Sequence, residues 1–233
     1  SIRDIQKDSL YSEYKDKVGE IIIGYYQRER NGNIFVDLGK VEGIMPKKFQ
    51  SPRETYRQND RIKALITEVK KAPAGLQVVL SRTDPDFVRR IMELEVPEIE
   101  QGVVEIKSVA REPGQRSKVA VLSTDERVDA VGACVGPRGA RVQAIVDELY
   151  DEKIDIVPYS EDPTTYIMNA LSPAKVNKIT LNEDEKSAYC IVPDNQLSLA
   201  IGKGGQNVRL AARLTEWKID IRSESQATAE GKA

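Results

Sequence analysis

Residues 199–214 read Leu199-Ala-Ile-Gly-Lys-Gly-Gly-Gln-Asn-Val-Arg-Leu-Ala-Ala-Arg-Leu214. A short apolar run ends at Ile201, a four-residue turn with glycine at both ends follows, and an amphipathic run then predicts a helix. Glycine has no Cβ, so the backbone at such a turn can approach a ligand closely. The helix start favours a phosphate, because free N–H groups and the positive end of the helix dipole lie there. We therefore predict a phosphate-binding turn, to which Lys203 adds a positive charge.

An earlier copy of this pattern is Ala133-Cys-Val-Gly-Pro-Arg-Gly-Ala-Arg-Val-Gln-Ala-Ile-Val146. Gly136 and Gly139 correspond to Gly202 and Gly205 at one constant offset. Further on, the segment 153–156 corresponds to 218–221, both reading Lys-Ile-Asp-Ile, after the loss of one residue. An Asp-Pro pair, at 84–85 and again at 162–163, opens a helical pattern in each copy. The repeat therefore covers a whole domain, and an internal repeat decides the architecture.

A G-x-x-G turn between two helices, beside a three-stranded sheet, is typical of a KH domain, whose loop clamps about four backbone nucleotides. With two such domains in tandem, the chain resembles the NusA family of bacterial transcription elongation and termination factors. The resemblance covers roughly residues 10–223, and the chain departs from the family pattern at Glu216 and Pro137. It is carried by the segments Ile201–Asn207, Ala211–Trp217, Leu94-Glu-Val-Pro-Glu-Ile99, Val109-Ala-Arg-Glu-Pro-Gly114 and Asn169-Ala-Leu-Ser-Pro-Ala-Lys175.

The chain order predicts a multidomain fold, an all-β OB-fold barrel followed by two α/β KH domains of the bacterial type, α-β-β-α-α-β. Residues 1–17 resemble the end of the helix that follows the polymerase-binding N-terminal domain of the family, so we expect the chain to be a fragment that lacks that domain. Residues 18–81 contain five short strands and the hairpin signal Asn31-Gly-Asn33, and they resemble an S1 domain. The KH domains are expected at 82–158 and 159–223, packed as one rigid body with a continuous RNA track. The small, polar residues of 224–233 predict a disordered tail.

The resemblance and the loop chemistry together define a predicted RNA-binding site. The first loop contributes Gly136, Pro137, Arg138 and Gly139, with Arg141 behind it. The second contributes Gly202, Lys203, Gly204, Gly205, Gln206 and Asn207, with Arg209. Bases are expected beside the loops, against Val135, Val142, Ile201 and Val208, although apolar residues at helical spacing are more often core.

Aromatic and basic side chains mark a second predicted RNA surface, on the S1 domain. Phe35 and Tyr25 are candidates for base stacking, with Arg28, Arg30, Lys47 and Lys48 as phosphate partners. Strand alternation leaves open whether either aromatic ring faces outward or into the barrel. In the second KH domain, Trp217 is expected to pack in the core and Arg213 to be solvated.

Composition places few limits on partners but excludes some chemistry. The 233 residues carry a net charge of −2 and are 40% hydrophobic, with a basic segment at 18–81 and an acidic one at 82–158. Histidine is absent, which removes the commonest general base and metal ligand. The two cysteines, Cys134 and Cys190, lie in apolar runs, which predicts buried free thiols and fits a reducing cytoplasm. No apolar run approaches the length of about 20 residues that spans a membrane.

Three other functions share some of these sequence features. A phosphate-transferring enzyme is disfavoured, because no hydroxyl follows Lys203 as in a G-x-x-x-x-G-K-[ST] loop. The RNA-binding end of an exoribonuclease has its KH domain before its S1 domain, the reverse of the order here. A protein-binding scaffold stays open, because the first KH segment is acidic.

The family resemblance implies a non-enzymatic, cytoplasmic and monomeric factor that uses no metal or cofactor. It implies binding to single-stranded nascent RNA, RNA polymerase, and other elongation and antitermination factors. Through these partners the factor would modulate pausing, termination and antitermination.

Overall fold

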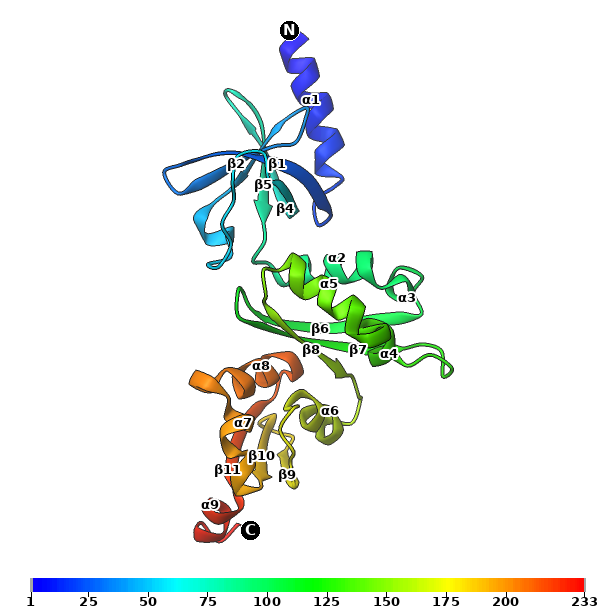
Figure 1. The fold of residues 1–233 in the computed structure, drawn as a ribbon, viewed down its shortest axis with the longest axis vertical. Helices are drawn as coiled ribbons and strands as arrows, with labels where there is room; N and C mark the ends of the chain where they lie inside the picture. Colours follow the sequence, from blue (N-terminus) through cyan, green and yellow to red (C-terminus); the bar gives the residue numbers. More distant parts are fainter. Residues whose placement is uncertain (1, 233) are drawn as a thin grey trace. The chain divides into compact units, whose positions relative to one another are not determined.

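The structure is a computed structural model that describes residues 2–232. The chain forms two compact units, one ending at Met92 and the other beginning at Glu93. The division falls inside helix α2 (Pro85–Glu95), which begins with proline at its first position, as the Asp84-Pro85 pair predicts. Figure 1 shows the barrel in the first unit and the layered sheets in the second.

The first unit is a closed five-stranded barrel on which helix α1 (Ile2–Lys15) packs. Its strands are β1 (Ile21–Arg30), β2 (Asn33–Asp37), β3 (Glu42–Met45), β4 (Arg61–Ala72) and β5 (Gly75–Ser81), with one turn of 3-10 helix, η1 (Lys47–Phe49), after β3. The strand order is β1-β2-β3-β5-β4, and β1 pairs with β4 to close the barrel. Closure leaves no free strand edge, as in OB-type barrels. The predicted OB-type barrel is thus confirmed.

Alternate residues of the strands fill the barrel. Ile34 and Val36 of β2 point inward, together with Met45 of β3, and each is at most 4% exposed. Tyr14 of α1 joins the same hydrophobic cluster, which explains why the helix lies on the barrel. The residues between them along β2 therefore face outward, by the two-residue period of a strand.

The second unit contains two three-stranded sheets with the same topology. The first has the order β6-β7-β8, and the second β9-β10-β11. In each sheet the first two strands are antiparallel and the last two parallel. The strands are β6 (Val104–Glu112), β7 (Arg116–Ser123), β8 (Lys153–Pro158), β9 (Lys178–Asn182), β10 (Ser187–Val192) and β11 (Lys218–Ser223). This repetition agrees with the repeat in the sequence and with the predicted bacterial KH fold.

Helices precede and connect these strands in the same order in both copies. The first copy begins with α2, the counterpart of α6 below, and continues with α3 (Pro97–Glu100), α4 (Ala130–Val135), η2 (Pro137–Gly139) and α5 (Ala140–Glu148). The second has α6 (Pro163–Ala170), η3 (Asp194–Gln196), α7 (Leu197–Ile201), η4 (Lys203–Gly205) and α8 (Gln206–Thr215). Each G-x-x-G segment thus lies between a short helix and a longer one, as predicted.

The two KH copies share one hydrophobic cluster. Ala110 of β6 and Ala120 of β7 belong to the cluster that contains Leu210 and Leu214 of α8. Helix α8 packs across β6 and β7, so the face of the first sheet that α4 and α5 leave open is covered by the second copy (Figure 1). The ammonium of Lys118, fully buried on β7, is held by Asp155 at 3.0 Å and by the Ser172 carbonyl at 2.9 Å. The expectation that the two copies pack together is confirmed.

The C-terminal segment differs from the prediction of a disordered tail over 224–233. Residues Glu224–Ala229 form helix α9, in which Ala227 is fully buried. The helix begins with a capping box, in which the Ser223 hydroxyl accepts from the Gln226 amide and the Gln226 side chain accepts from the Ser223 amide. The Glu230 carboxylate accepts hydrogen bonds from the Tyr189 hydroxyl and from Arg222. Capping and burial order this segment despite its small, polar composition.

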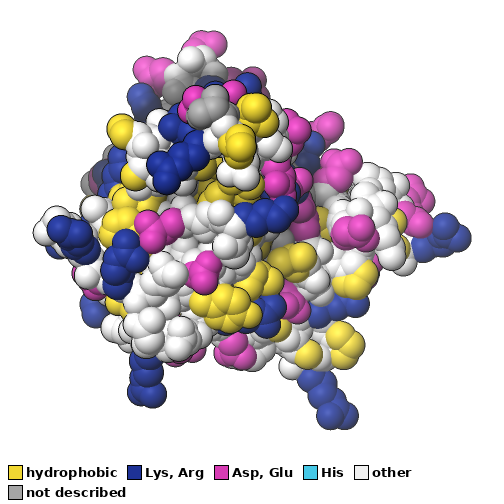
Figure 2. All heavy atoms as spheres, turned by 90° about the horizontal axis from the view of Figure 1, so that it is seen from above, with side chains coloured by type: hydrophobic (Ala, Val, Ile, Leu, Met, Phe, Trp, Pro, Cys, Tyr) yellow, Lys and Arg dark blue, Asp and Glu magenta, His cyan; other side chains and the backbone are white. Residues whose placement is uncertain are grey.

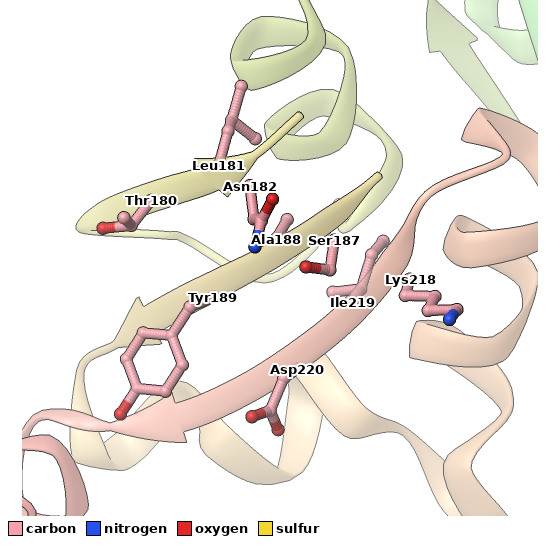
Figure 3. A pocket seen from close by; sticks show the side chains of 9 residues that line it. All are labelled: Thr180, Leu181, Asn182, Ser187, Ala188, Tyr189, Lys218, Ile219 and Asp220. Carbon is pink, nitrogen blue, oxygen red and sulfur yellow. The ribbon is translucent and has the colours of Figure 1, made fainter. Parts of the chain in front are cut away.

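The face of the second sheet that points away from the shared cluster carries a shallow pocket (Figure 3). It spans all three strands, and Tyr189 stands at its side. The side chains on this face are mostly polar, in contrast to Cys190 and Val192, which point into the cluster. The lining residues that face outward are Thr180, Asn182, Ser187, Tyr189, Lys218 and Asp220, and the pocket also touches Leu181, Ala188 and Ile219, whose side chains pack on the shared cluster.

Candidate nucleic-acid interface

The two G-x-x-G loops have the same backbone conformation. Gly136 has φ 76° and ψ 171°, and Gly202 has φ 79° and ψ 168°. The last glycines, Gly139 and Gly205, are left-handed, with φ 73° and 77°. In both loops the amide of the last glycine donates to the carbonyl of the first, at 3.1 Å. The repeat in the sequence therefore produces two copies of one structural device.

The first glycine of each loop is fixed by packing as well as by its positive φ. A Cβ on Gly136 would lie 2.6 Å from Cγ of Arg141. A Cβ on Gly202 would lie 2.7 Å from the backbone nitrogen of Asn207. Both distances are shorter than the contacts that Cβ atoms make in proteins, so the loop lies directly against the start of the following helix.

The last glycine of each loop has open space beside it. A Cβ on Gly139 would have Val142 Cγ1 as its nearest neighbour, at 3.9 Å, and one on Gly205 would meet only Arg209 Nη1, at 3.7 Å. Glycine is favoured at these positions by the left-handed φ. The missing side chain also leaves the backbone open to a ligand at the N-termini of α5 and α8. Neither helix has a side-chain cap there, so the positive end of each dipole faces the loop.

The loop tips present exposed side chains. Pro137 and Arg138 are exposed in the first loop, as are Lys203 and Gly204 in the second. Arg138 has φ 57°, close to the 62° of Gly204 at the corresponding position. The tip therefore accepts a non-glycine residue in the left-handed conformation, and the charge it carries can be changed without changing the loop's shape.

Two of the predicted contact residues point inward. Asn207 is 4% exposed, and its Nδ2 donates to the carbonyls of Leu171 (3.0 Å) and Ala200 (2.9 Å). Nη1 of Arg141 donates to the Ala133 carbonyl at 2.7 Å and to the Glu98 carboxylate at 2.8 Å. Both side chains tie the start of the long helix to the end of the short helix before it. They hold the loop in place from behind.

Arg209 lies at the second loop but is engaged by protein groups. Its Nη1 donates to the Gly204 carbonyl at 3.0 Å, and its Nε and Nη2 donate to the two oxygens of Glu112, each at 2.8 Å. Hydrogen bonding to Arg209 lowers the pKa of the Glu112 carboxyl below its usual value, although burial opposes this. Gln206 donates to Gln115 at 2.9 Å. These two predicted residues therefore connect the second loop to the β6–β7 turn of the first KH copy.

The aliphatic residues expected beside the loops are half-buried: Val135, Val142, Ile201 and Val208. Ile201 and Val208 also pack on the shared cluster, so they contribute to the core and to the surface next to the loop. Trp217 packs on the same cluster, in agreement with its predicted role. Arg213 is exposed, with a guanidinium nitrogen 3.9 Å from Glu112.

In the barrel, both candidate aromatic residues face outward. Phe35 lies between the inward-pointing Ile34 and Val36, and Tyr25 is 52% exposed. Tyr25 pairs with Asp37 across the β1–β2 ladder, which places it diagonal to Phe35 on the outer face.

A basic side chain lies on one of these rings. The Arg28 guanidinium is 4.4 Å from the centroid of the Phe35 ring and pairs with Glu42 at 3.1 Å. Arg30, at the end of β1, and Lys47 and Lys48, in η1, are also exposed in this unit. The outer face of β1 and β2 thus combines aromatic and basic groups, the combination used to bind single strands.

Surface charge alone does not mark a binding site on the face shown in Figure 2. Basic and acidic side chains are intermixed there, with hydrophobic side chains between them. The candidate interface therefore rests on the two loops and on the aromatic face of the barrel.

Three family descriptions match successive parts of the chain. The S1 RNA binding domain matches residues 15–81, the NusA-like first KH domain residues 82–159, and the NusA-like second KH domain residues 163–229. The transcription termination/antitermination protein NusA of Mycobacterium tuberculosis is 44% identical over 239 residues, covering 99% of this chain and 69% of that protein. The chain belongs to the NusA family.

Other NusA proteins are more similar in sequence but longer relative to this chain. That of Halalkalibacterium halodurans is 58% identical, and that of Bacillus subtilis 54%, each over 226 residues and 97% of this chain. The chain spans 59% and 61% of the lengths of these two proteins. Among solved structures, the crystal structure of APE1850 matches 57% of this chain and 96% of that chain, at 22% identity and a TM-score of 0.44.

Sequence reasoning missed one group at the interface of this NusA-family chain. Glu112 was not singled out, although it contacts Arg209 directly. Its partner lies in the other copy, so no local spacing indicates the contact.

Over residues 2–232, the structure contains no helix long and apolar enough to cross a membrane. Within the same residues, no three His, Cys, Asp or Glu side chains gather closely enough to suggest a metal site.

Proposed function

We propose that this chain binds single-stranded RNA through its two G-x-x-G loops, with the outer face of β1 and β2 as a further contact surface. The observation that carries the proposal is the identical backbone of two loops whose helices both present an uncapped N-terminus. Gly136, Gly139, Gly202 and Gly205 allow the backbone to approach phosphates, and Arg138 and Lys203 supply charge. Arg141 and Asn207 support the loops from behind, and Arg209 and Gln206 connect the second loop to the first copy.

The names of the relatives support a role in transcription. We propose that the chain belongs to a cytoplasmic factor that holds nascent RNA beside RNA polymerase and modulates pausing, termination and antitermination, together with other elongation and antitermination factors. Binding, rather than catalysis, is the proposed activity, and it uses no metal or cofactor. We propose that the chain acts as a monomer, with domain boundaries at 18–81, 82–158 and from 159 onward, the last domain including helix α9.

Titration of fluorescent single-stranded RNA tests the loops. The variant Pro137→Asp/Arg138→Asp/Lys203→Asp/Gly204→Asp places acidic groups where phosphates are expected, and the left-handed tip positions accept aspartate. We expect the affinity to fall by at least about tenfold, and the affinity of the unaltered chain to fall steeply with salt. Lys175→Asp/Lys178→Asp/Lys186→Asp, exposed in and just before the β9–β10 hairpin, changes the net charge by the same amount and is the control for net charge.

The outcomes separate RNA binding from the scaffold alternative. Equal losses in the loop variant and the control would assign the effect to net charge rather than to the loops. If neither a defined RNA nor a random pool binds the unaltered chain, the KH domains serve protein partners instead.

A further inference from the structure

The two loops share a conformation but differ in what can stiffen them. The first loop contains Pro137, whose ring fixes φ, and a side chain at its tip, Arg138. The second loop has three glycines, Gly202, Gly204 and Gly205, all with positive φ. Glycine loses more conformational freedom on ordering than any other residue. The second loop therefore needs an external contact to populate the same conformation to the same extent.

Arg209 provides this contact. Its guanidinium forms a bridge with Gly204 on one side and Glu112 on the other. Nη1 donates to the carbonyl of Gly204 at 3.0 Å, while Nε and Nη2 bind the carboxylate of Glu112 as a parallel pair, each at 2.8 Å. A paired guanidinium is held in one plane and orientation. The carboxylate therefore aims the third nitrogen at the tip of the loop.

Glu112 is itself held in place. It is the last residue of β6, and its side chain is 15% exposed. Oε1 also accepts from Gln206 at 3.3 Å, and Gln206 donates to Gln115 on the same turn at 2.9 Å. The start of α8 is thus attached to the first KH copy by several polar contacts next to the loop.

The first copy uses the corresponding position differently. Gln143 occupies the place of Arg209 in the repeat, and its amide donates to Asp147 of the same helix at 2.8 Å. The bridge from Arg209 to Glu112 joins residues that are 97 apart in the chain. The contact of Arg209 with Glu112 therefore has no counterpart at Gln143 in the first copy, and it lies at the glycine-rich second loop.

We infer that Glu112 is a positioning residue for RNA binding: through Arg209 it holds the second G-x-x-G loop in its binding conformation, so that this loop depends on the first KH domain. The inference rests on the proposed function. For the loss of Glu112, the inference predicts a change in RNA affinity opposite in sign to the change that charge alone would produce. Removing an acidic group beside a phosphate site should strengthen RNA binding electrostatically, whereas removing the positioning group weakens it.

The test uses the whole chain with the first loop disabled by Pro137→Asp/Arg138→Asp, so that RNA affinity reports on the second loop. Glu112→Ala is expected to weaken binding about tenfold, which corresponds to losing one charge-assisted hydrogen bond that orders the loop. Glu112→Gln, which keeps an acceptor, is expected to lose less. Glu105→Ala removes the same charge from the exposed part of β6 and serves as the matched control.

Hydrogen exchange provides a readout that does not depend on RNA. In Glu112→Ala, the amides of 202–206 are expected to exchange faster, and those of 136–140 at the original rate. Arg209→Ala should produce the same change, with no further effect of Glu112→Ala in that background. Stronger or unchanged RNA binding in Glu112→Ala, or unchanged exchange in 202–206, would overturn the inference. If the unaltered chain binds no RNA either, the proposed function fails, and the exchange result alone decides whether Glu112 holds the loop.

Discussion

Glu152, in the turn that precedes β8, has a fully buried carboxylate that bonds four donors. Oε1 accepts from the Gly114 amide at 2.7 Å and from Arg111 Nη2 at 2.9 Å. Oε2 accepts from Arg111 Nε at 3.0 Å and from the Ser117 hydroxyl at 2.9 Å. Arg111 is itself only 7% exposed, so neither member of the pair can be solvated if the other is lost.

The substitution Glu152→Gln removes the negative charge and replaces one acceptor oxygen with an amide donor. Both carboxylate oxygens of Glu152 accept hydrogen bonds in the native chain. In either orientation of the glutamine side chain, its NH₂ group would therefore face a donor instead of an acceptor. Removing one partner of a buried pair costs about 3–5 kcal/mol. Glutamine keeps the shape and one acceptor, so we expect the free energy of unfolding of the second unit to fall by about 3 kcal/mol.

Urea unfolding measures this loss directly. Trp217 is the chain's one tryptophan and lies in the second unit, so its fluorescence reports on that unit. Glu105→Gln, on the exposed part of β6, is the matched control. A loss of less than about 1 kcal/mol would put Glu152→Gln in the range of a surface pair and contradict the reasoning. The apolar pair Arg111→Met/Glu152→Leu should be more stable than Glu152→Gln alone, because it leaves no charge unpaired.

Three further predictions concern the loop, the thiols and the barrel face. Gly136→Ala should lower the free energy of unfolding by about 2 kcal/mol, measured in urea, because the methyl group meets Arg141 and the left-handed φ is strained. Burial raises the pKa of Cys134 to about 11 and that of Cys190 to about 12, so at pH 8 both thiols should react with a disulfide reagent only after unfolding. Fast labelling of the native chain would refute their burial. Tyr25→Ala should weaken RNA binding about tenfold in the same titration and leave stability unchanged, because the ring is 52% exposed.

The loops could be predicted because their requirements are local. Gly136 and Gly202 are needed by a backbone conformation and by the next helix, and both lie within a few residues of the turn. The constant spacing of the repeat therefore identified them without any knowledge of tertiary structure.

The roles of Arg141 and Asn207 could not be predicted in the same way. They follow the loops directly and carry polar groups, which is typical of ligand contacts. In the structure the first glycine lies against this position, so the side chain runs beneath the loop to carbonyls of the preceding helix. The direction in which these two side chains point depends on the left-handed turn of the loop. The sequence indicates that turn only through its pair of glycines.

The orientation of Tyr25 was undecided for a related reason. The pairing of β1 with β2 shifts between Tyr26 and Arg28, where an extra residue interrupts the alternation. The inward–outward alternation of side chains along β1 therefore cannot be extended from residues on one side of this irregularity to residues on the other.

Helix α9 shows a different failure. Its composition suggested disorder, but Ser223 and Gln226 form a capping box that the sequence displays openly as S-x-x-Q. The capping signal is local, and it outweighs the small, polar composition of the segment. The buried Ala227 was not accessible to sequence reasoning, because small residues occur equally in tails and at close contacts.

The shared cluster between the KH copies means that the unit of sequence duplication is not the unit of cooperative folding. A cut in the short connection after Pro158 would expose Ala110, Ala120 and Val157 on one product, and the ammonium of Lys118 would lose its partner at Ser172. Each half would expose apolar surface that is buried in the intact chain, and such surface promotes association. Dividing this chain between its two repeats would therefore split a single folding unit into two parts.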